Sequence, residues 1–314
     1  MRVVFFGTPD IALPCLEAVA AHHEVAAVVT QPDRPKGRRR KPAPPPVKVR
    51  AEAEGLPVHQ PAKLNDGTFE AWLREQAPDL CVVAAYGRLL KQPIIDVPPK
   101  GYLNLHPSLL PRWRGPSPIR TAILEGDAET GVTIMKLVLE MDAGDILVQR
   151  RTPIEPDEDA VALSERLARL GAEAMLDALA QVECGTAEFT PQNPAAVTTC
   201  SIFRKEDGRI RWDAPAEGVH NLVRAAVPWP VAHCLFRGEV FRIHRTALTD
   251  ASAQAAPGTI TTVEKDRMLV ACADRRLAIL EIQAPGKRAM ATGEFLRGAH
   301  VEPGERFEEI GDAG

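Results

Sequence analysis

The sequence predicts an α/β protein in which a doubly wound, mostly parallel sheet is followed by a small β-barrel. Residues 2–30 have the pattern of a strand, a turn, a helix and a second strand, which is how a doubly wound sheet begins. Residues 80–85 are a continuous apolar run, as expected of a parallel strand that is covered on both faces. After residue 240, short strands alternate with turns that contain Gly or Asp, which is typical of a small barrel or sandwich.

The 314 residues are enough for two domains. A Thr-, Pro- and Asn-rich stretch without periodicity, 186–202, is predicted to be a linker between domains 1–185 and 203–314. In the first domain we expect helices at 11–21, 47–53, 69–76, 116–124 and 159–182, and strands at 2–6, 25–30, 80–85, from 103, 132–137 and 146–150. In the second we expect a helix at 215–226 and strands at 240–244, 258–260, 268–272 and 277–282.

The composition indicates a cytoplasmic globular protein. No apolar run approaches the ~20 residues that a membrane helix needs, and a strand beginning next to Met1 leaves no room for a signal peptide. The six cysteines lie far apart without a C-x-x-C pair, which argues against a zinc site and a disulfide framework. No helix pattern suggests an exposed apolar stripe for dimerisation, so we expect a monomer. Nothing visible in the sequence requires a metal.

Two polar side chains interrupt the predicted strand that begins at Leu103. Because side chains alternate across a strand, Asn104 and His106 point to one side while Leu103 and Leu105 point to the other. A lone histidine in such a strand is more simply a satisfied core residue. An amide and an imidazole in register at the end of a strand, where open α/β sheets bind their ligands, favour a catalytic site instead.

An acidic turn supplies a third group. Residues 132–137 are predicted to form a strand, and a turn over residues 141–145 follows it. An aspartate in this turn can reach over the same edge of the sheet and pair with His106. Spacing alone leaves Asp142 and Asp145 as nearly equal candidates, and either one can also be an ordinary turn residue.

Amide, imidazole and carboxylate together suit acyl transfer to an amine. The amide and a protonated imidazole would stabilise the oxyanion of the tetrahedral intermediate. The carboxylate would keep the imidazole charged and help to remove the proton from the attacking nitrogen.

Three motifs around these residues occur together: Asn104-Leu105-His106, Ser108-Leu109-Leu110-Pro111 and Asp142-Ala143-Gly144-Asp145. With these motifs, and with further stretches at 4–10, 31–35, 112–115, 129–133, 228–230 and 285–290, the chain resembles the folate-dependent formyltransferases over nearly its whole length. The resemblance implies a formyltransferase-type, Rossmann-like catalytic domain and a C-terminal barrel that is similar to oligonucleotide-binding barrels.

The resemblance also implies roles for individual residues. The family's catalytic amide, imidazole and carboxylate fall on Asn104, His106 and Asp142, which decides against Asp145. Its folate-contacting loop falls on Ser108, Leu109, Leu110 and Pro111. The activity implied is transfer of the formyl group of 10-formyltetrahydrofolate, as co-substrate, to the α-amino group of methionyl-tRNA, the initiator.

A basic segment lies past the end of the second predicted strand. Six of its eight residues are basic, namely Arg34, Lys36, Arg38, Arg39, Arg40 and Lys41, and without them the net charge of −4 would be −10 (−4 − 6). Such a run is often only a solvated loop. We interpret it as an arm that neutralises tRNA phosphates, because it lies at the same sheet edge as the catalytic pair. Charge and resemblance make Lys287 and Arg288 further candidates for phosphate contacts.

Three other functions remain open from the sequence. A formyltransferase for a small amine, such as a sugar nucleotide or glycinamide ribonucleotide, needs neither the basic arm nor the second domain. A formyl-folate hydrolase would use the same site with water as the nucleophile. A protein that only binds RNA would leave the Asn104, His106 and Asp142 constellation unexplained.

Overall fold

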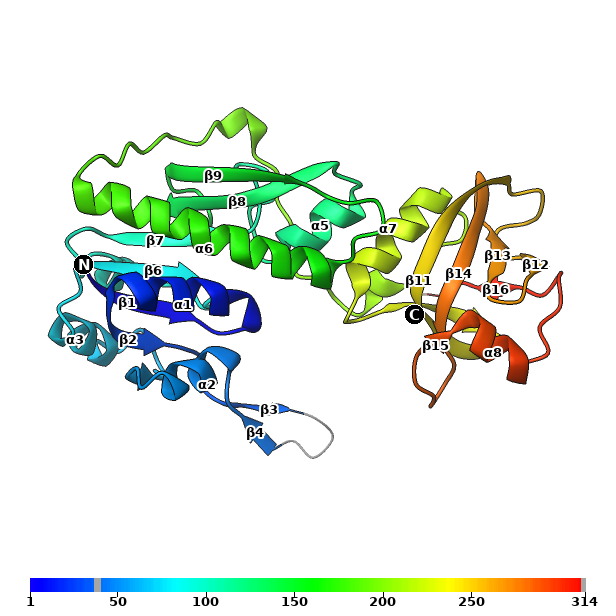
Figure 1. The fold of residues 1–314 in the computed structure, drawn as a ribbon, viewed down its shortest axis with the longest axis horizontal. Coiled ribbons are helices and arrows are strands. Elements are labelled where there is room, and N and C mark those ends of the chain that lie inside the picture. The colour runs from blue at the N-terminus through cyan, green and yellow to red at the C-terminus, as the bar shows by residue number, and fades with distance from the viewer. Residues whose placement is uncertain (37–40, 312–314) are drawn as a thin grey trace. The chain divides into compact units, whose positions relative to one another are not determined.

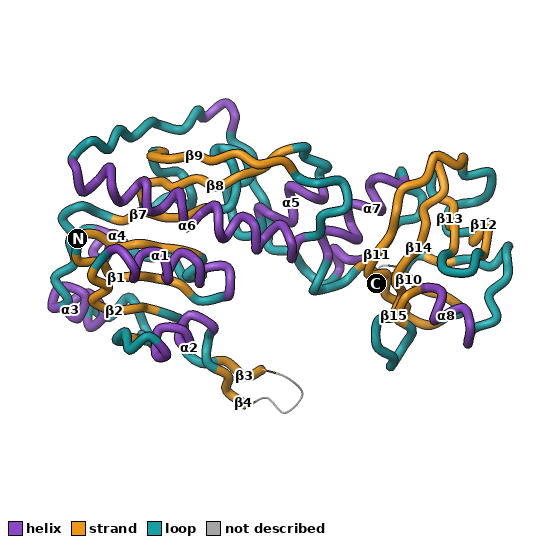
Figure 2. Tube along the Cα trace, in the orientation of Figure 1, coloured by secondary structure: helices purple, strands orange, loops and turns teal. Residues whose placement is uncertain are grey.

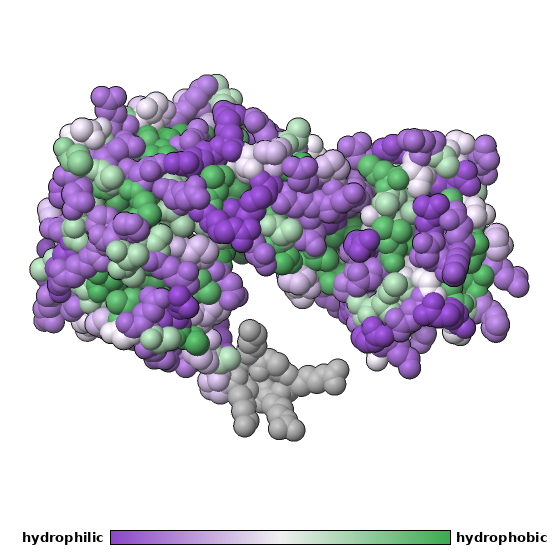
Figure 3. Space-filling model, in the orientation of Figure 1, coloured by the Kyte–Doolittle hydropathy of each residue, from purple (hydrophilic) through white to green (hydrophobic). Residues whose placement is uncertain are grey.

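A computed structural model describes residues 1–36 and 41–311 of the chain (Figure 1). The chain forms two compact units, which comprise residues 1–118, 129–153 and 164–200 and residues 119–128, 154–163 and 201–314, respectively. The stretch expected to be a linker thus belongs to the first unit up to residue 200. In the view of Figure 3, hydrophilic residues cover most of the surface of each unit. None of the helices in the described part is long and apolar enough to cross a membrane.

The first unit is built on a seven-stranded sheet. In spatial order its strands are β5 (Val58–His59), β2 (Glu24–Val29), β1 (Arg2–Gly7), β6 (Leu80–Ala84), β7 (Tyr102–His106), β8 (Glu129–Lys136) and β9 (Ile146–Pro153). The strands from β5 to β7 are parallel, whereas β8 and β9 are antiparallel to their neighbours. The chain winds outward from β1 in both directions, so the predicted doubly wound, mostly parallel sheet is confirmed.

Helices cover both faces of this sheet (Figure 2). They are α1 (Leu13–His22), α2 (Pro46–Ala53), α3 (Thr68–Glu75), α4 (Gln92–Ile95) and α6 (Ala160–Cys184), with a 3₁₀ turn η1 (Asp10–Ala12) before α1. α1 and α6 cross one face, where Gly171 of α6 meets the side chain of Leu105. On the other face α3 and α4 share a core with Phe6, Val83 and Tyr102. Because both faces are covered, a strand such as β6 is apolar throughout.

The basic segment starts as a hairpin. β3 (Arg34–Lys36) and β4 (Lys41–Ala43) pair antiparallel, with Pro35 opposite Pro42. Arg38, Arg39 and Arg40 lie outside the described residues. β2 and β7 are parallel members of one sheet, so the hairpin follows β2 at the sheet edge where β7 also ends, as the sequence predicted.

The second unit contains an antiparallel sheet, as predicted, but the strand expected at 240–244 extends over 14 residues. Its strands are β12 (Ile260–Val263), β13 (Met268–Ala271), β14 (Arg275–Gln283), β11 (Glu239–Ser252), β10 (Ala232–Phe236) and β16 (Phe307–Glu308), with β15 (Met290–Ala291) beside β14. Its helices and turns are α5 (Pro118–Leu124), η3 (Glu206–Gly208), α7 (Ala216–Ala226) and α8 (Thr292–Gly298). Ile260 N donates to Glu305 O (2.8 Å) and Phe307 N to Gly258 O (2.9 Å), so hydrogen bonds join the two edges of the sheet into a small barrel.

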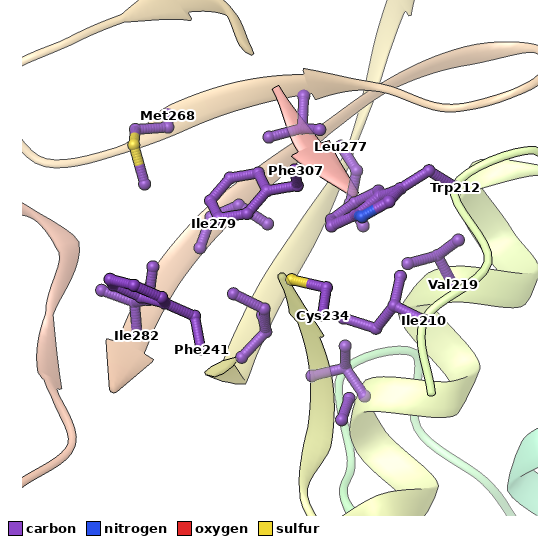
Figure 4. Close-up of a cluster of buried hydrophobic side chains, with 14 of the residues drawn as sticks. Ile210, Trp212, Val219, Cys234, Phe241, Met268, Leu277, Ile279, Ile282 and Phe307 are labelled. Carbon is purple, nitrogen blue, oxygen red and sulfur yellow. The ribbon is translucent and has the colours of Figure 1, made fainter. Parts of the chain in front are cut away.

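The barrel has a core of its own (Figure 4). The indole of Trp212 stacks on Phe307 with ring centroids 5.6 Å apart, and both side chains are fully buried. Residues from α7, such as Val219, close the core from one side. The burial of these apolar side chains allows the second unit to fold around a core of its own.

Two Gly→Ala substitutions are expected to change stability in opposite directions. A Cβ on Gly131 in β8 would lie 2.1 Å from Arg150 O, so Gly131→Ala must push two strands apart and should cost about 1–3 kcal/mol. A Cβ on Gly218 in α7 would meet nothing within 4 Å, so Gly218→Ala should stabilise the protein by about 0.5–1 kcal/mol. Urea unfolding followed by circular dichroism measures both changes, and equal signs would contradict this packing.

Candidate active site

The Asn104 and His106 side chains lie on the sheet face opposite α6. Leu105, between them in β7, packs against α6, where a Cβ on Gly171 would lie 2.6 Å from Leu105 Cδ1. Tyr102, two residues before Asn104, belongs to the core on the other face. The alternation predicted from the sequence is therefore present, and the amide and imidazole project from one face of one strand.

His106 is held between a backbone carbonyl and a carboxylate. Its Nε2 donates to Trp113 O (3.0 Å), and its Nδ1 lies 3.7 Å from Asp142 Oδ1. Since a carbonyl only accepts, the ring carries its proton on Nε2 and presents a bare Nδ1 to Asp142. The side chain is almost fully buried, with 4% of its surface exposed.

The charge of His106 differs from the sequence-based expectation. Burial lowers the pKa of His106 below its usual 6.5, and the Asp142 carboxylate and the bond to Trp113 offset this only in part. The expectation that Asp142 keeps the imidazole charged is therefore wrong for the protein without substrate. The physical reason is that desolvation penalises the imidazolium more than a carboxylate beyond hydrogen-bond distance can stabilise it.

Asp142 approaches His106 because its loop folds back over the sheet. β8 is antiparallel to β7, and Lys136 at its end lies opposite Leu103 at the start of β7. The connection 137–145 therefore begins beside the amino-terminal end of β7 and runs across the face of that strand toward His106. It does not approach His106 over the sheet edge at the carboxyl end of β7. Gly144 permits this path, because a Cβ there would lie 1.7 Å from Lys136 O.

The structure places Asp142, not Asp145, next to the imidazole. Asp142 has φ +52°, a backbone conformation that is uncommon outside glycine. Its Oδ2 accepts from Gly115 N (2.8 Å), which leaves Oδ1 toward His106. Asp145 instead continues the strand pairing, where its carbonyl accepts from Lys136 N (2.9 Å).

The Asn104 amide has unused hydrogen-bonding capacity. It is half-buried and, within residues 1–36 and 41–311, its side chain makes no hydrogen bond. A partly desolvated amide donor without a protein partner suits an oxygen that a ligand brings.

The loop after β7 is held by buried hydrogen bonds. Thr133 Oγ1 donates to Ser108 O (2.7 Å) and accepts from Leu110 N (3.1 Å), and Ser108 Oγ donates to Arg112 O (2.7 Å). Ser108 and Leu110 are buried, whereas Leu109 and Pro111 are partly exposed. Of the four residues predicted to contact folate, two thus shape the loop from inside and two reach the surface.

Several residues around the site escaped the sequence analysis. Gln192, in the stretch expected to be a linker, donates to Asp142 O and Gly144 O (2.8 Å each). Leu139 and Met141, on the loop that carries Asp142, are more than half exposed. An apolar pair next to the candidate aspartate is a signal that the sequence contains, whereas nothing in the pattern around Gln192 indicated a partner.

The predicted phosphate contacts occur in both units. Arg34 is an exposed residue, and its guanidinium donates to Gln31 Oε1. The backbones of Lys36 and Lys41 are register partners in the hairpin. In the second unit Lys287 is exposed after β14, and Arg288 pairs with Glu294 (2.6 Å).

No metal centre is found in the described residues. Among residues 1–36 and 41–311, no three His, Cys, Asp or Glu side chains come together in a way that would hold an ion.

Comparison with known proteins identifies the class. Residues 1–179 match the formyl transferase family, and residues 203–300 match the formyl transferase C-terminal domain. The chain belongs to the folate-dependent formyl transferase family.

Its similarity to particular members extends over nearly the whole chain. It is 44% identical to a methionyl-tRNA formyltransferase of Moorella thermoacetica, over 97% of this chain and 98% of that one. It is 43% identical to a methionyl-tRNA formyltransferase of Thermus thermophilus, over 99% of this chain and 100% of that one.

Solved structures with the same fold are more distant. A sugar 3N-formyl transferase, WlaRD, superposes with a TM-score of 0.68 at 16% identity, over 92% of this chain and 99% of that one. HypX from Aquifex aeolicus, in complex with tetrahydrofolic acid, superposes with a TM-score of 0.65 at 20% identity, over 99% of this chain and 51% of that longer one. At these identities the likeness establishes the fold alone.

Replacing the carboxylate should shift the His106 titration. Asp142→Asn removes the charge that raises the pKa of His106, so we expect that pKa to fall further. Imidazole nitrogen NMR measures the shift. His220, buried in the second unit with Nδ1 2.8 Å from Thr246 Oγ1, is the internal control and should titrate unchanged.

A rise of the His106 pKa in Asp142→Asn would contradict this arrangement.

The lowered pKa of His106 also determines how pH affects the stability of the protein. Because the folded protein disfavours the imidazolium, the contribution of His106 to stability is present above about pH 6.5 and is lost as the pH falls through the lowered pKa.

Proposed function

We propose that the protein transfers the formyl group of 10-formyltetrahydrofolate to the α-amino group of methionyl-tRNA, giving formylmethionyl-tRNA for the initiation of translation. The observation that carries this proposal is 44% identity to a methionyl-tRNA formyltransferase over 97% of the chain. The placement of Asn104, His106 and Asp142 about one face of β7 supports it. The folate supplies the formyl carbon, and its N10 is the leaving group.

The acceptor amine is ready to react at neutral pH. An α-amino group has a pKa of about 7.7–8, so a substantial share of it is unprotonated. Its attack on the formyl carbon forms the new C–N bond and places negative charge on the formyl oxygen. The Asn104 amide, half-buried and without a protein partner in the described residues, donates to that oxygen.

The proton of the attacking nitrogen passes to the His106 and Asp142 pair. The bare Nδ1 of a neutral imidazole can accept it, and Asp142 at 3.7 Å then stabilises the imidazolium that forms. When N10 departs it takes up a proton, so the pair returns to its resting charge. This assignment replaces the imidazolium donor expected from the sequence, since burial favours the neutral ring.

The loop from Ser108 to Pro111 contributes to folate binding. Leu109 and Pro111 present partly exposed apolar surface, while Ser108 and Leu110 hold the loop in place from inside. We assign no resident cofactor or metal to the reaction; the folate is a co-substrate.

The acceptor stem of the tRNA is bound by basic side chains of both units. The arm contributes Arg34, Lys36, Arg38, Arg39, Arg40 and Lys41, and the second unit contributes Lys287 and Arg288. Each neutralised phosphate releases counterions, which makes the affinity depend on salt. Domains 1–185 and 203–314 then divide catalysis and tRNA binding in a monomer that works in the cytoplasm, where translation begins.

An acceptor assay tests the function directly. The protein is incubated with 10-formyltetrahydrofolate and, in separate reactions, methionyl-tRNA, a sugar-nucleotide amine, glycinamide ribonucleotide or no acceptor. We expect formylation of methionyl-tRNA alone. Formylation of a small amine, or release of formate without an acceptor, would reject the proposal in favour of one of the alternatives.

Loss of a catalytic side chain should lower kcat and leave tRNA affinity unchanged. Removing one oxyanion donor typically costs about 10²–10³ in rate, so we expect a fall of that size for Asn104→Ala. His106→Ala should cost about 10²–10⁴ through loss of the proton acceptor. Single-turnover kinetics with titrated methionyl-tRNA separates rate from affinity. Asp142→Asn should also lower kcat, because the imidazolium that forms loses its carboxylate partner. Asp145→Asn is its matched control, and equal losses in these two variants would contradict the assignment.

Neutralising the arm should have the reverse effect. With Arg38, Arg39 and Arg40 all changed to Ser, we expect KM for methionyl-tRNA to rise and its salt dependence to weaken, because fewer counterions are released. The chemical step at saturating tRNA should be retained. Arg169→Ser on α6 is the control for loss of surface charge. An unchanged slope of log KM against log salt would count against a phosphate contact.

A further inference from the structure

The side chain of Gln192 joins the two loops that surround His106. Its Nε2 donates to Asp142 O and to Gly144 O at 2.8 Å each, and its Oε1 accepts from Arg114 Nε at 3.0 Å. Both donor positions of the amide are therefore used on the loop that carries Asp142. The acceptor is used on the loop that carries Gly115.

These contacts close a ring around the catalytic carboxylate. Gln192 bonds Arg114, the next residue Gly115 donates to Asp142 Oδ2 (2.8 Å), and the Asp142 carbonyl bonds Gln192. Arg114 Nη1 also lies 3.4 Å from Oε1 of Glu140, which is on the loop that carries Asp142. The carboxylate and the backbone of Asp142 are thus fixed by two different neighbours that are themselves connected.

Asp142 needs such support. Its φ of +52° costs about 1–2 kcal/mol for a residue with a side chain. The loop leaves the strand pairing for residues 138–144, so the carbonyls of Asp142 and Gly144 have no strand partner. An amide that satisfies both carbonyls offsets the strain and selects one conformation of the loop.

The segment around Gln192 is itself anchored. Thr190 and Ile146 exchange two backbone hydrogen bonds of 2.8 Å at the start of β9. Further along, Thr198 N donates to Pro111 O (3.2 Å), and Arg114 N donates to Thr198 O (2.9 Å). The stretch that the sequence presented as a linker is therefore fixed on both sides of Gln192, against the same loops that the side chain bridges.

We propose that Gln192 is a positioning residue for formyl transfer, which holds the Asp142 carboxylate within reach of His106 through the backbone of residues 142–144. The inference rests on the proposed function for its kinetic consequence only. Its structural content, the placement of Asp142 against Nδ1, belongs to the free protein.

Two substitutions separate the possible uses of the amide. Gln192→Glu keeps an acceptor for Arg114 and loses both donors, whereas Gln192→Met keeps the length and loses donors and acceptor. If the bonds to the Asp142 loop matter, both variants should lower kcat by about 10–100-fold, with KM for methionyl-tRNA and folate unchanged. Asn193→Ala is the control, because the Asn193 side chain bonds Ala195 N in its own 3₁₀ turn η2 (Pro194–Ala196) and should leave kcat unchanged.

A Gln192→Glu variant with wild-type kcat would overturn the proposal, because the donors would then be dispensable. A rise in KM at constant kcat would overturn it as well, since the residue would act in binding. Thermal unfolding of both variants checks that the comparison is made on folded protein.

Imidazole nitrogen NMR on the free protein gives a readout that general destabilisation does not move. In Gln192→Met, Asp142 is expected to drift from Nδ1, so the pKa of His106 should fall in the same direction as in Asp142→Asn. An unchanged His106 titration in folded Gln192→Met would reject the positioning role. This result is independent of the acceptor, so failure of the proposed function, seen as wild-type inactivity on methionyl-tRNA, is distinguishable from failure of this inference.

Discussion

The site depends on a desolvated imidazole that faces a single carboxylate. His106 is 4% exposed, and burial outweighs the attraction of Asp142 at 3.7 Å, which lowers the pKa of His106 and favours the neutral ring with its proton on Nε2. A neutral ring next to a fixed negative charge is prepared to take up a proton, because the imidazolium would gain a partner at the moment it forms. The other features of the site keep this pair together: the Gly115 amide on Oδ2, and Gln192 on the loop backbone.

The antiparallel strand β8 explains where the site lies. In a purely parallel doubly wound sheet, ligand-binding loops gather at the carboxyl ends of the strands. Here the loop 137–145 starts at the opposite end of β7 and crosses its face, which brings the Asp142 carboxylate next to His106, the last residue of that strand. Glycine at 144 is required for that close approach, and the positive φ of Asp142 aims its carboxylate at the ring.

The second unit needs none of this chemistry to be stable. It has its own closed set of strand pairings and its own aromatic core around Trp212 and Phe307. Its contribution in our proposal is electrostatic, through exposed cations such as Lys287. In that proposal the function of the whole chain is assembled from two folds, one of which orients reacting groups while the other increases affinity for a polyanion.

Local patterns in the sequence were enough for the fold class and for the placement of Asn104 and His106 on one face of one strand. Alternation along one strand determines that Asn104 and His106 share a face, and apolar runs determine which strands are buried. Spacing alone left Asp142 and Asp145 tied, and it was the family resemblance that favoured Asp142. The sequence also implied a charged His106 and made Gln192 part of a linker. Only the tertiary structure showed the contacts that hold Asp142 next to the imidazole, the burial of His106 and the place of Gln192. Each depends on contacts between segments far apart in the chain, on backbone angles that most residues avoid, and on burial, none of which a short-range pattern records.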